Sequence, residues 1–170
     1  SDASSLDSIL QRHLNLWEDI WGKDEREKSL SDRFIGIIRR AHLKTGRRVV
    51  ILVDEYDKPL LQAIGNEQLQ EEYRSILKPF YGVLKTMDGS IQFALLMGVT
   101  KFGKVSVFSD LNNLMDISMD DRYVEICGMT EAEIHTYMKQ GVLDLACKQQ
   151  MDYEEVCQEL KRRYDGYHFT

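Results

Sequence analysis

Residues 49–55 read VVILVDE, and this stretch decides the fold. Its first five residues are aliphatic or β-branched, and two adjacent carboxylates follow them. An apolar run of this kind predicts a strand buried on both faces, as in a parallel sheet flanked by helices. Open α/β sheets bind their ligands at the carboxyl ends of the strands. Asp54 and Glu55 fall at that end, so they are the first candidates for a functional site.

The two acids suit different tasks at a nucleotide site. Asp54 can hold Mg²⁺, and Glu55 can orient and deprotonate an attacking water, which is the Walker B arrangement of P-loop nucleotide hydrolases. Side chains alternate along a strand, so the two carboxylates would point to opposite faces while the strand persists. The alternative is that the acids cap a neighbouring helix or face solvent. The phosphate-binding loop G-x-x-x-x-G-K-[ST] that would complete such a site does not occur in the 170 residues.

Composition limits the classes of function. Hydrophobic residues make up 43% of the chain and charged residues 29%, which indicates a soluble domain with a sizeable core. A net charge of −6 disfavours sequence-independent binding to nucleic acid or to anionic membrane. No apolar run is long enough to span a membrane, and the first residues lack the features of a signal peptide. Three cysteines without a C-x-x-C motif fit reduced thiols, so we expect a cytoplasmic protein without a zinc site.

The hydrophobic pattern predicts an alternation of helices with two strands. Helices are expected at 4–21, 30–44, 59–65, 67–87, 130–140 and 153–164, and strands at 48–54 and 91–99. Gly46 should end the second helix, Pro79 should kink or divide the fourth, and Thr130 with Glu133 forms a capping-box pattern. The helical connection predicts a parallel strand pair with a right-handed crossover. Because two strands do not make a stable parallel sheet, a third is needed, and 123–127 is one weak candidate.

The second strand adds a further pair of candidates. It leads into Thr100 and Lys101, where the strand next to Walker B often carries a polar residue near the γ-phosphate. The alternatives are a strand-end hydroxyl bonded to backbone for Thr100 and a solvated side chain for Lys101 or Lys104. Residues 100–122 show little periodicity but are too apolar to be disordered, which is typical of a functional segment.

Four segments together resemble one protein family. They are VILVDEYDKPL at 50–60, GVTKFGKVSVFSDLNNL at 98–114, CGMTEAE at 127–133 and YDGYHF at 164–169. The chain is similar, from about Ser5 to its last residue, to the AAA-ATPase-like family of bacterial proteins. That family is related to the archaeal ATPases and to the STAND branch of P-loop proteins.

The resemblance implies an ATP-binding P-loop fold with ATP and Mg²⁺ as cofactors. Asp54 would hold the metal, Glu55 would be the catalytic general base, and Thr100 and Lys101 would bind nucleotide near the sensor position. It also implies a Walker A loop upstream of Ser1 and often a PD-(D/E)XK nuclease domain downstream of Thr170. Residues 1–170 alone would then bind ATP poorly, because they lack the phosphate-gripping loop.

We therefore predict an α/β protein with a partial P-loop-like parallel sheet flanked by helices and a helical C-terminal part. Residues 1–128 would form the ATPase core, and 129–170 a helical extension or the start of a lid. The predicted function is Mg²⁺-dependent ATP hydrolysis that controls an attached effector such as a nuclease. Expected partners are ATP, a possible second copy of the chain, and nucleic acid only through the nuclease, with no membrane.

Two other readings remain. One is a non-catalytic switch or interaction module controlled by nucleotide, suggested by the irregular apolar segment at 102–114. The other makes Asp54, Glu55 and Asp57 a metal-dependent nuclease cluster. This second reading lacks a lysine in the D-x_n-E-x-K spacing that such nucleases use, so it is the weaker one.

Overall fold

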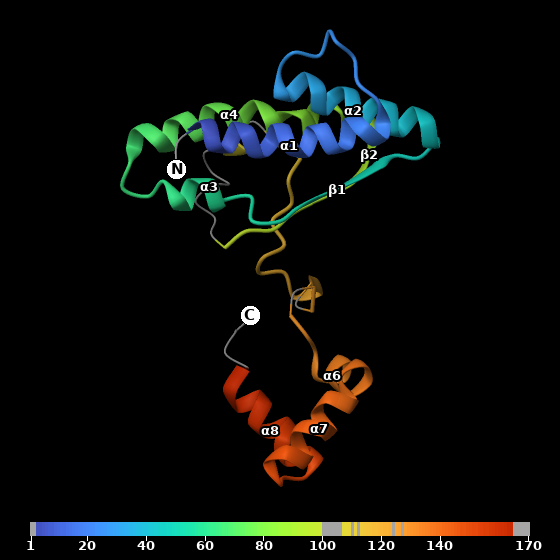
Figure 1. The fold of residues 1–170 in the computed structure, drawn as a ribbon, viewed down its shortest axis with the longest axis vertical. Coiled ribbons are helices and arrows are strands. Elements are labelled where there is room, and N and C mark those ends of the chain that lie inside the picture. The colour runs from blue at the N-terminus through green and yellow to red at the C-terminus, as the bar shows by residue number, and fades with distance from the viewer. Residues whose placement is uncertain are drawn as a thin grey trace. The chain divides into compact units, whose positions relative to one another are not determined.

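The computed structural model describes residues 3–99, 107–109, 111, 113–123, 125–126 and 128–164 (Figure 1). The chain divides into two compact units, Ser1–Leu114 and Met115–Thr170. The sequence predicts a different division, between an ATPase core at 1–128 and a helical extension at 129–170. That division is based on function and stays a prediction.

The first unit consists of helices and a small parallel sheet. Its elements are α1 (Ala3–Trp21), α2 (Leu30–Thr45), β1 (Val49–Val53), α3 (Lys58–Gln62), α4 (Glu67–Thr86), the 3₁₀ turn η1 (Asp88–Ser90) and β2 (Ile91–Leu96). The predicted helices and both strands are thus confirmed, with strand ends that differ by a few residues. Gly46 ends α2 in the left-handed conformation at φ 64°, and its N–H donates to the carbonyl of His42. Glycine is favoured at this position because it adopts positive φ without strain.

Helix α4 continues through Pro79 and is not divided there. Proline removes the N–H that would donate to the carbonyl of Ser75. Both residues are exposed, so water can satisfy that carbonyl. The opposite side of α4 carries the buried residues Tyr73, Leu77 and Phe80. Packing on that side holds the helix together across the proline.

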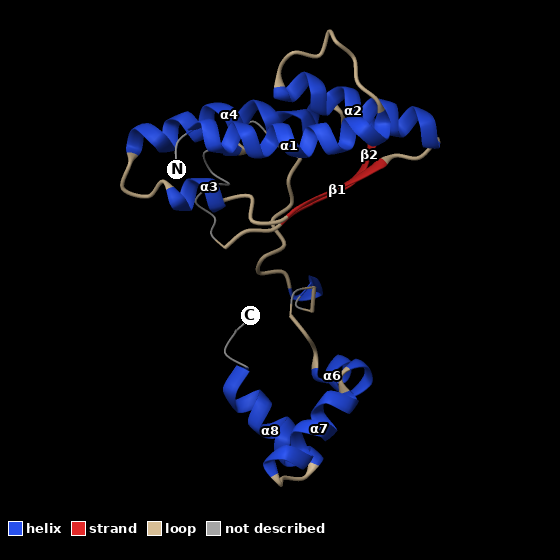
Figure 2. Ribbon diagram, viewed as in Figure 1, coloured by secondary structure: helices blue, strands red, loops and turns tan. Residues whose placement is uncertain are grey.

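Strands β1 and β2 pair in parallel, as predicted, with α3 and α4 in the connection between them (Figure 2). One face of the pair packs on the core through Ile51 and Ile91, beneath the layer formed by α1, α2 and α4 (Figure 1). The opposite face is open, with Val50, Leu52 and Phe93 exposed by 54%, 68% and 50%. The expectation of a sheet buried on both faces is therefore wrong for the described residues, because helices cover one face of it.

The third-strand candidate at 123–127 is also corrected. Tyr123 lies in the 3₁₀ turn η2 (Asp121–Tyr123), and Glu125 and Ile126 form a turn and a bend. Val124 and Cys127 fall outside the described residues. Within the part of the chain that the structure describes, the sheet has two strands.

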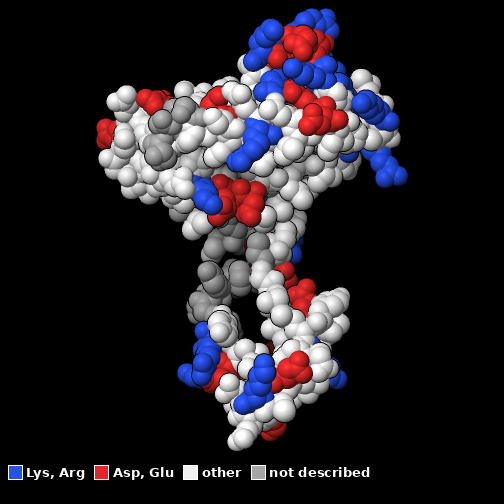
Figure 3. Space-filling view, viewed as in Figure 1, with Lys and Arg blue, Asp and Glu red and all other residues white. Residues whose placement is uncertain are grey.

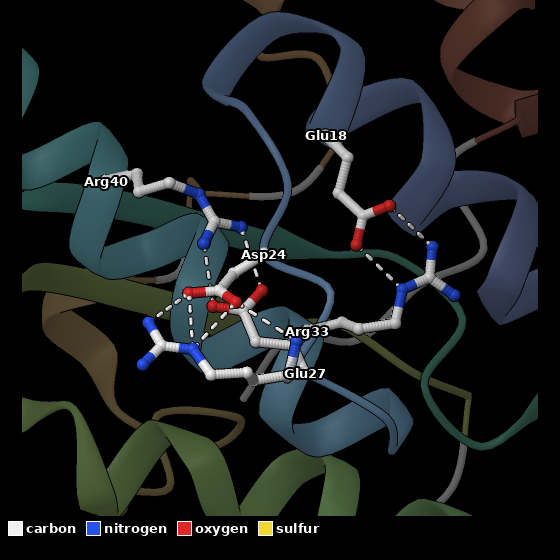
Figure 4. Close-up of polar contacts among 6 residues, drawn as sticks. Glu18, Asp24, Glu27, Arg33 and Arg40 are labelled. Carbon is white, nitrogen blue, oxygen red and sulfur yellow. Dashed lines mark hydrogen bonds and ion pairs between the residues drawn. The ribbon is translucent and has the colours of Figure 1, made fainter.

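Two ion pairs fasten α2 to α1 and to the loop that joins them (Figure 4). Arg33 donates to both oxygens of Glu18 at 2.7 and 2.8 Å, and Arg40 donates to both oxygens of Glu27 at 2.7 and 3.0 Å. The carboxylate of Glu27 lies so close to Gly36 of α2 that a Cβ there would collide with it. Charges of both signs crowd over this loop on the surface (Figure 3). The hairpin is thus closed by paired charges as well as by apolar contact.

After the turn η2, the described residues of the second unit form three α-helices, α6 (Glu131–Tyr137), α7 (Lys139–Gln149) and α8 (Tyr153–Tyr164). The predicted capping box of Thr130 and Glu133 is present, and α8 has the predicted bounds. Helix α7 was not predicted. It packs through Val142 and Ala146 against Val156 of α8. Across both units, no helix among the described residues is long and apolar enough to cross a membrane.

The pair of Glu18 and Arg33 predicts a pH-dependent contribution to stability. The hydrogen bonds from Arg33 hold the pKa of Glu18 below its ordinary value, and the Glu18 side chain is only 5% exposed. Replacing one partner of a buried pair leaves the other charge without compensation, so Arg33→Met should lower the free energy of unfolding by about 3 kcal/mol at pH 7. A carboxyl group whose pKa is lowered in the folded state stabilises that state at pH values above the unfolded pKa. This stabilisation is lost as the pH falls through the folded pKa. The deficit of Arg33→Met should therefore shrink in acid.

Urea denaturation at pH 7 and at progressively lower pH measures this effect. Arg26→Met is the matched control, because Arg26 also pairs with a carboxylate in the same hairpin but has a 90% exposed side chain. The control should leave the free energy of unfolding nearly unchanged. A deficit in Arg33→Met that stays constant or grows in acid would contradict the assignment.

Candidate functional site

The backbone at the carboxyl end of β1 departs from a regular ladder. The N–H of Met97 donates to the carbonyl of Val53 at 2.8 Å, and the carbonyl of Met97 accepts from the N–H of Tyr56 at 3.0 Å. In a regular parallel pair that second donor would be Glu55, two residues after Val53. One extra residue is thus inserted between the two hydrogen bonds. The ladder closes again at Tyr56, and Asp54 and Glu55 bulge out of it.

Glu55 takes up the extra residue. Its φ is 52°, in the left-handed region that side chains other than glycine rarely adopt. Residues in this conformation concentrate at functional sites, and bulges commonly redirect a side chain next to one. The simple alternation expected for Asp54 and Glu55 along a strand is therefore replaced by a bulge. Both side chains are exposed at the end of the sheet.

The two acids have local partners. The N–H of Glu55 donates to Oδ1 of Asp54 at 2.9 Å, and Nζ of Lys58 donates to Oε2 of Glu55 at 2.5 Å. The hydrogen bond to Glu55 raises the pKa of Lys58, and the charge of Asp54 adds to the shift. The Glu55 and Lys58 side chains are both about half exposed, so water screens the pair and little free energy holds it. Glu55 is therefore able to exchange Lys58 for another partner.

The exposed carboxylates at the end of β1 are the groups here that could contribute to a metal site. Among the residues that the structure describes, no group of three His, Cys, Asp or Glu side chains could hold a metal ion. Mg²⁺ is commonly bound by one or two carboxylates, with water and substrate phosphates as the other ligands. Asp54 offers an exposed carboxylate of this kind. An exposed carboxylate of this kind can serve as one ligand of such an ion.

After the acid pair, the chain enters the core. The residue after Glu55, Tyr56, contacts the ring of Phe108 at a centroid distance of 5.2 Å, and Phe108 contacts Tyr81 of α4 at 5.0 Å. Burial raises the pKa of Tyr81 to about 12, and the negative charge of Asp57 adds to this shift. Asp57 itself is fully buried. Sequence reasoning missed Tyr56 and Phe108, although aromatic residues in both candidate segments were a signal.

The structure brings together some of the predicted site residues and separates others. Asp54 and Glu55 lie side by side at the sheet end, whereas Asp57 is buried in the core. The three acids thus do not converge on one metal, which removes the basis of the nuclease-cluster reading. Thr100 and Lys101, the predicted nucleotide-binding residues, lie outside the described residues.

Comparison with known proteins finds a family match that covers the acid pair and its surroundings. The sequence model of a family described as "Predicted AAA-ATPase" matches residues 1–108, which include both strands, the bulge and Phe108. The chain belongs to this predicted AAA-ATPase family. It is also 38% identical over 169 residues to a protein of Azotobacter chroococcum mcd 1 described as "Uncharacterized protein in vnfD 5'region".

The match to the Azotobacter protein covers 99% of this chain but 31% of that protein. The chain thus spans about a third of the length of the relative it matches. No solved structure matches the chain. The family match ends within the first unit, so the predicted AAA-ATPase assignment rests on the unit that carries Asp54 and Glu55.

The left-handed backbone of Glu55 predicts an unusual order of stabilities. Glycine adopts this conformation without the clash that a Cβ causes. Alanine has a Cβ and therefore retains the clash. Glu55→Gly should therefore be more stable than Glu55→Ala by about 1 kcal/mol. Urea denaturation of the two variants measures the difference, and Lys58, whose partner is removed in both, affects them equally.

Exposed positions in regular strand backbone supply the control. Glycine is normally less stable than alanine in a strand, so the Leu52→Gly and Leu52→Ala pair should show the opposite order. The same order at positions 52 and 55 would contradict the left-handed assignment of Glu55.

Proposed function

We propose that this chain provides the metal-binding and water-activating part of a Mg²⁺-dependent ATPase site. Asp54 would hold Mg²⁺, Glu55 would act as general base toward the attacking water, and Thr100 and Lys101 would lie near the γ-phosphate. The observation that carries the proposal is the exposed acid pair at the end of β1, where a bulge with positive φ directs Glu55. Membership in the predicted AAA-ATPase family supports the choice of ATP.

The environment of the acid pair suits these tasks. A general base must be ionised and within reach of the water that it deprotonates. Glu55 is paired with a cation in a solvent-exposed ion pair, which allows it to change partner. Asp54 keeps an exposed carboxylate one residue away, so a Mg²⁺ ion and an activated water would be close neighbours.

The open face of the sheet supports a larger P-loop architecture. A two-stranded parallel sheet that leaves Leu52 and Phe93 exposed is expected to have low stability by itself. Such sheets normally have more strands and a second covering layer. In our proposal β1 and β2 are the Walker B and sensor strands of a wider parallel sheet in the whole protein. The phosphate-binding loop would come from outside residues 1–170, and these residues alone would bind ATP weakly. Such an ATPase could control an attached effector such as a nuclease.

The general-base role predicts a separation between ATP binding and turnover. In the full-length protein, Glu55→Gln should bind Mg²⁺·ATP with nearly unchanged affinity, because it keeps the size of the side chain. Turnover should fall by about 10²–10⁴, the usual contribution of a general base. Phosphate release and equilibrium binding of ATP measure the two quantities.

Glu67→Gln is the matched control, since Glu67 is an exposed glutamate at the start of α4. It should change neither quantity. Turnover in Glu55→Gln equal to that of the unmodified protein would remove the general-base role.

A second candidate function is a nucleotide-dependent switch with slow turnover. The contact of Tyr56 with Phe108 favours it, because it links the residue after Glu55 to the segment that follows β2. Phe108 is only 5% exposed, so any movement of Tyr56 would disturb its packing. Nucleotide at the acid pair could in this way change the segment at 102–114.

This candidate predicts a digest that depends on nucleotide. With Mg²⁺·ATP bound, limited proteolysis of the full-length protein should change its rate of cleavage within 102–114, where Lys104 offers a tryptic site. Phe108→Ala should remove the difference, because the ring that connects the segment to Tyr56 is lost. Cleavage at Lys148 on α7 is the internal control. Identical digests with and without ATP would contradict the switch.

A further inference from the structure

Asp57 is a charged residue with no exposed surface, two residues beyond Glu55. Burying a carboxylate is costly unless specific interactions compensate, so buried acids are rare. Glu18, the other buried charged residue among those described, is held by the guanidinium of Arg33. The position of Asp57 thus has a structural or functional reason, and its surroundings indicate which.

Capping of a helix does not account for Asp57. It occupies the N-cap position of α3, where an Asp side chain usually accepts from the N–H of the second or third helical residue. Its side chain makes no such hydrogen bond, and its backbone, at φ −94° and ψ −9°, is helical where an N-cap residue is normally extended. The carboxyl group is directed to another contact.

That contact is with the end of β2. A Cβ built on Gly98 would lie 2.7 Å from Oδ1 of Asp57, 2.9 Å from its Cγ and 2.5 Å from Cε1 of Tyr56. Each distance is shorter than real Cβ atoms show, so these two side chains require glycine. Gly98 is not among the glycines with positive φ. Close approach, and not backbone conformation, therefore explains why glycine occupies position 98.

We propose that Asp57 is a positioning residue for the acid pair, acting together with Tyr56. Its buried carboxyl packs against Gly98 and sets the distance between the end of β2 and the bulge that carries Glu55. This inference rests on the proposed function, and in it Asp57 touches neither nucleotide nor metal. Gly98 directly follows Met97, whose N–H and carbonyl make the two hydrogen bonds on either side of the bulge. A shift of Gly98 would therefore shift the acceptor of the Tyr56 N–H and redirect Glu55.

The aromatic residues near Asp57 support a fixed position for its side chain. Tyr81 lies near enough for the charge of Asp57 to raise the pKa of its hydroxyl, in addition to the larger effect of burial. The ring of Phe108 lies between Tyr56 and Tyr81. Tyr56 thus contacts Phe108 and also lies close to Gly98.

Gly98→Ala in the full-length protein tests the inference with little direct loss of core packing, because residue 98 is exposed. The added methyl group should push Tyr56 and Asp57 away. We expect kcat for ATP to fall by about tenfold or more, since small displacements of a catalytic group are costly. KM should stay within about threefold, because the contacts that bind nucleotide remain. Gly82→Ala is the matched control, since a Cβ at Gly82 meets nothing within 4 Å.

Amide hydrogen exchange gives a second readout that needs no ATP. Gly98→Ala should speed exchange of the Tyr56 N–H by about tenfold or more, because its hydrogen bond to Met97 is weakened. Gly82→Ala should leave that rate unchanged. Slow exchange at Tyr56 together with an unchanged kcat in Gly98→Ala would overturn the inference.

Variants at Asp57 separate positioning from general stability. Asp57→Asn keeps the shape of the side chain and should retain kcat and slow Tyr56 exchange, whereas Asp57→Ala should reproduce Gly98→Ala. Equal losses in Asp57→Asn and Asp57→Ala would overturn positioning by shape. If Asp57→Ala does not fold, Gly98→Ala and Asp57→Asn decide the question. Absence of ATP turnover in the unmodified protein would overturn the proposed function, and Tyr56 exchange would then decide the positioning role alone.

Discussion

The two hydrogen bonds of Met97 are the constraint on which the site depends. They join the end of β2 to Val53 before the acid pair and to Tyr56 after it. Any residue held between two such fixed points must take up the extra length, and Glu55 does so with a positive φ. The chain then enters α3 at Lys58, with Asp57 buried beneath the turn. The exposure of Glu55 and the burial of Asp57 thus follow from one local arrangement.

This arrangement needs a rigid support, which the helical layer provides. Core residues of β1 and β2 pack on one side against α1, α2 and α4, and the bidentate pair of Glu18 with Arg33 ties α1 to α2. The stacked rings of Phe34 and Phe80, with centroids 4.8 Å apart, join α2 to α4. Since interiors are closely packed, a displacement of one helix would be transmitted to the strands. The support lies on one face of the sheet, and the opposite face keeps exposed apolar residues.

Sequence reasoning found the features that local signals determine. The apolar run at 49–53 predicts β1, Gly46 predicts the end of α2, and the pattern of Thr130 and Glu133 predicts the start of α6. Helix α7 was missed because Gly141, a poor helix former, lies within a segment with weak periodicity. The bulge at Glu55 could not be predicted, because it is defined by hydrogen bonds of Met97, a residue more than forty positions away that directly follows β2. The open sheet face was unpredictable for a related reason: an apolar run indicates that a strand can be covered, not what covers it.

The same limit explains why two neighbouring acids with similar local sequence have opposite environments. Glu55 and Asp57 both follow an apolar strand, and their composition alone would place both at the surface. The difference arises from the backbone, because the bulge turns Glu55 outward and the start of α3 turns Asp57 toward Gly98. An exposed carboxylate can change partners at little cost, whereas a buried one keeps a fixed position. A catalytic base needs the first property and its support needs the second, so the exposure of Glu55 and the burial of Asp57 suit the roles that we propose for them.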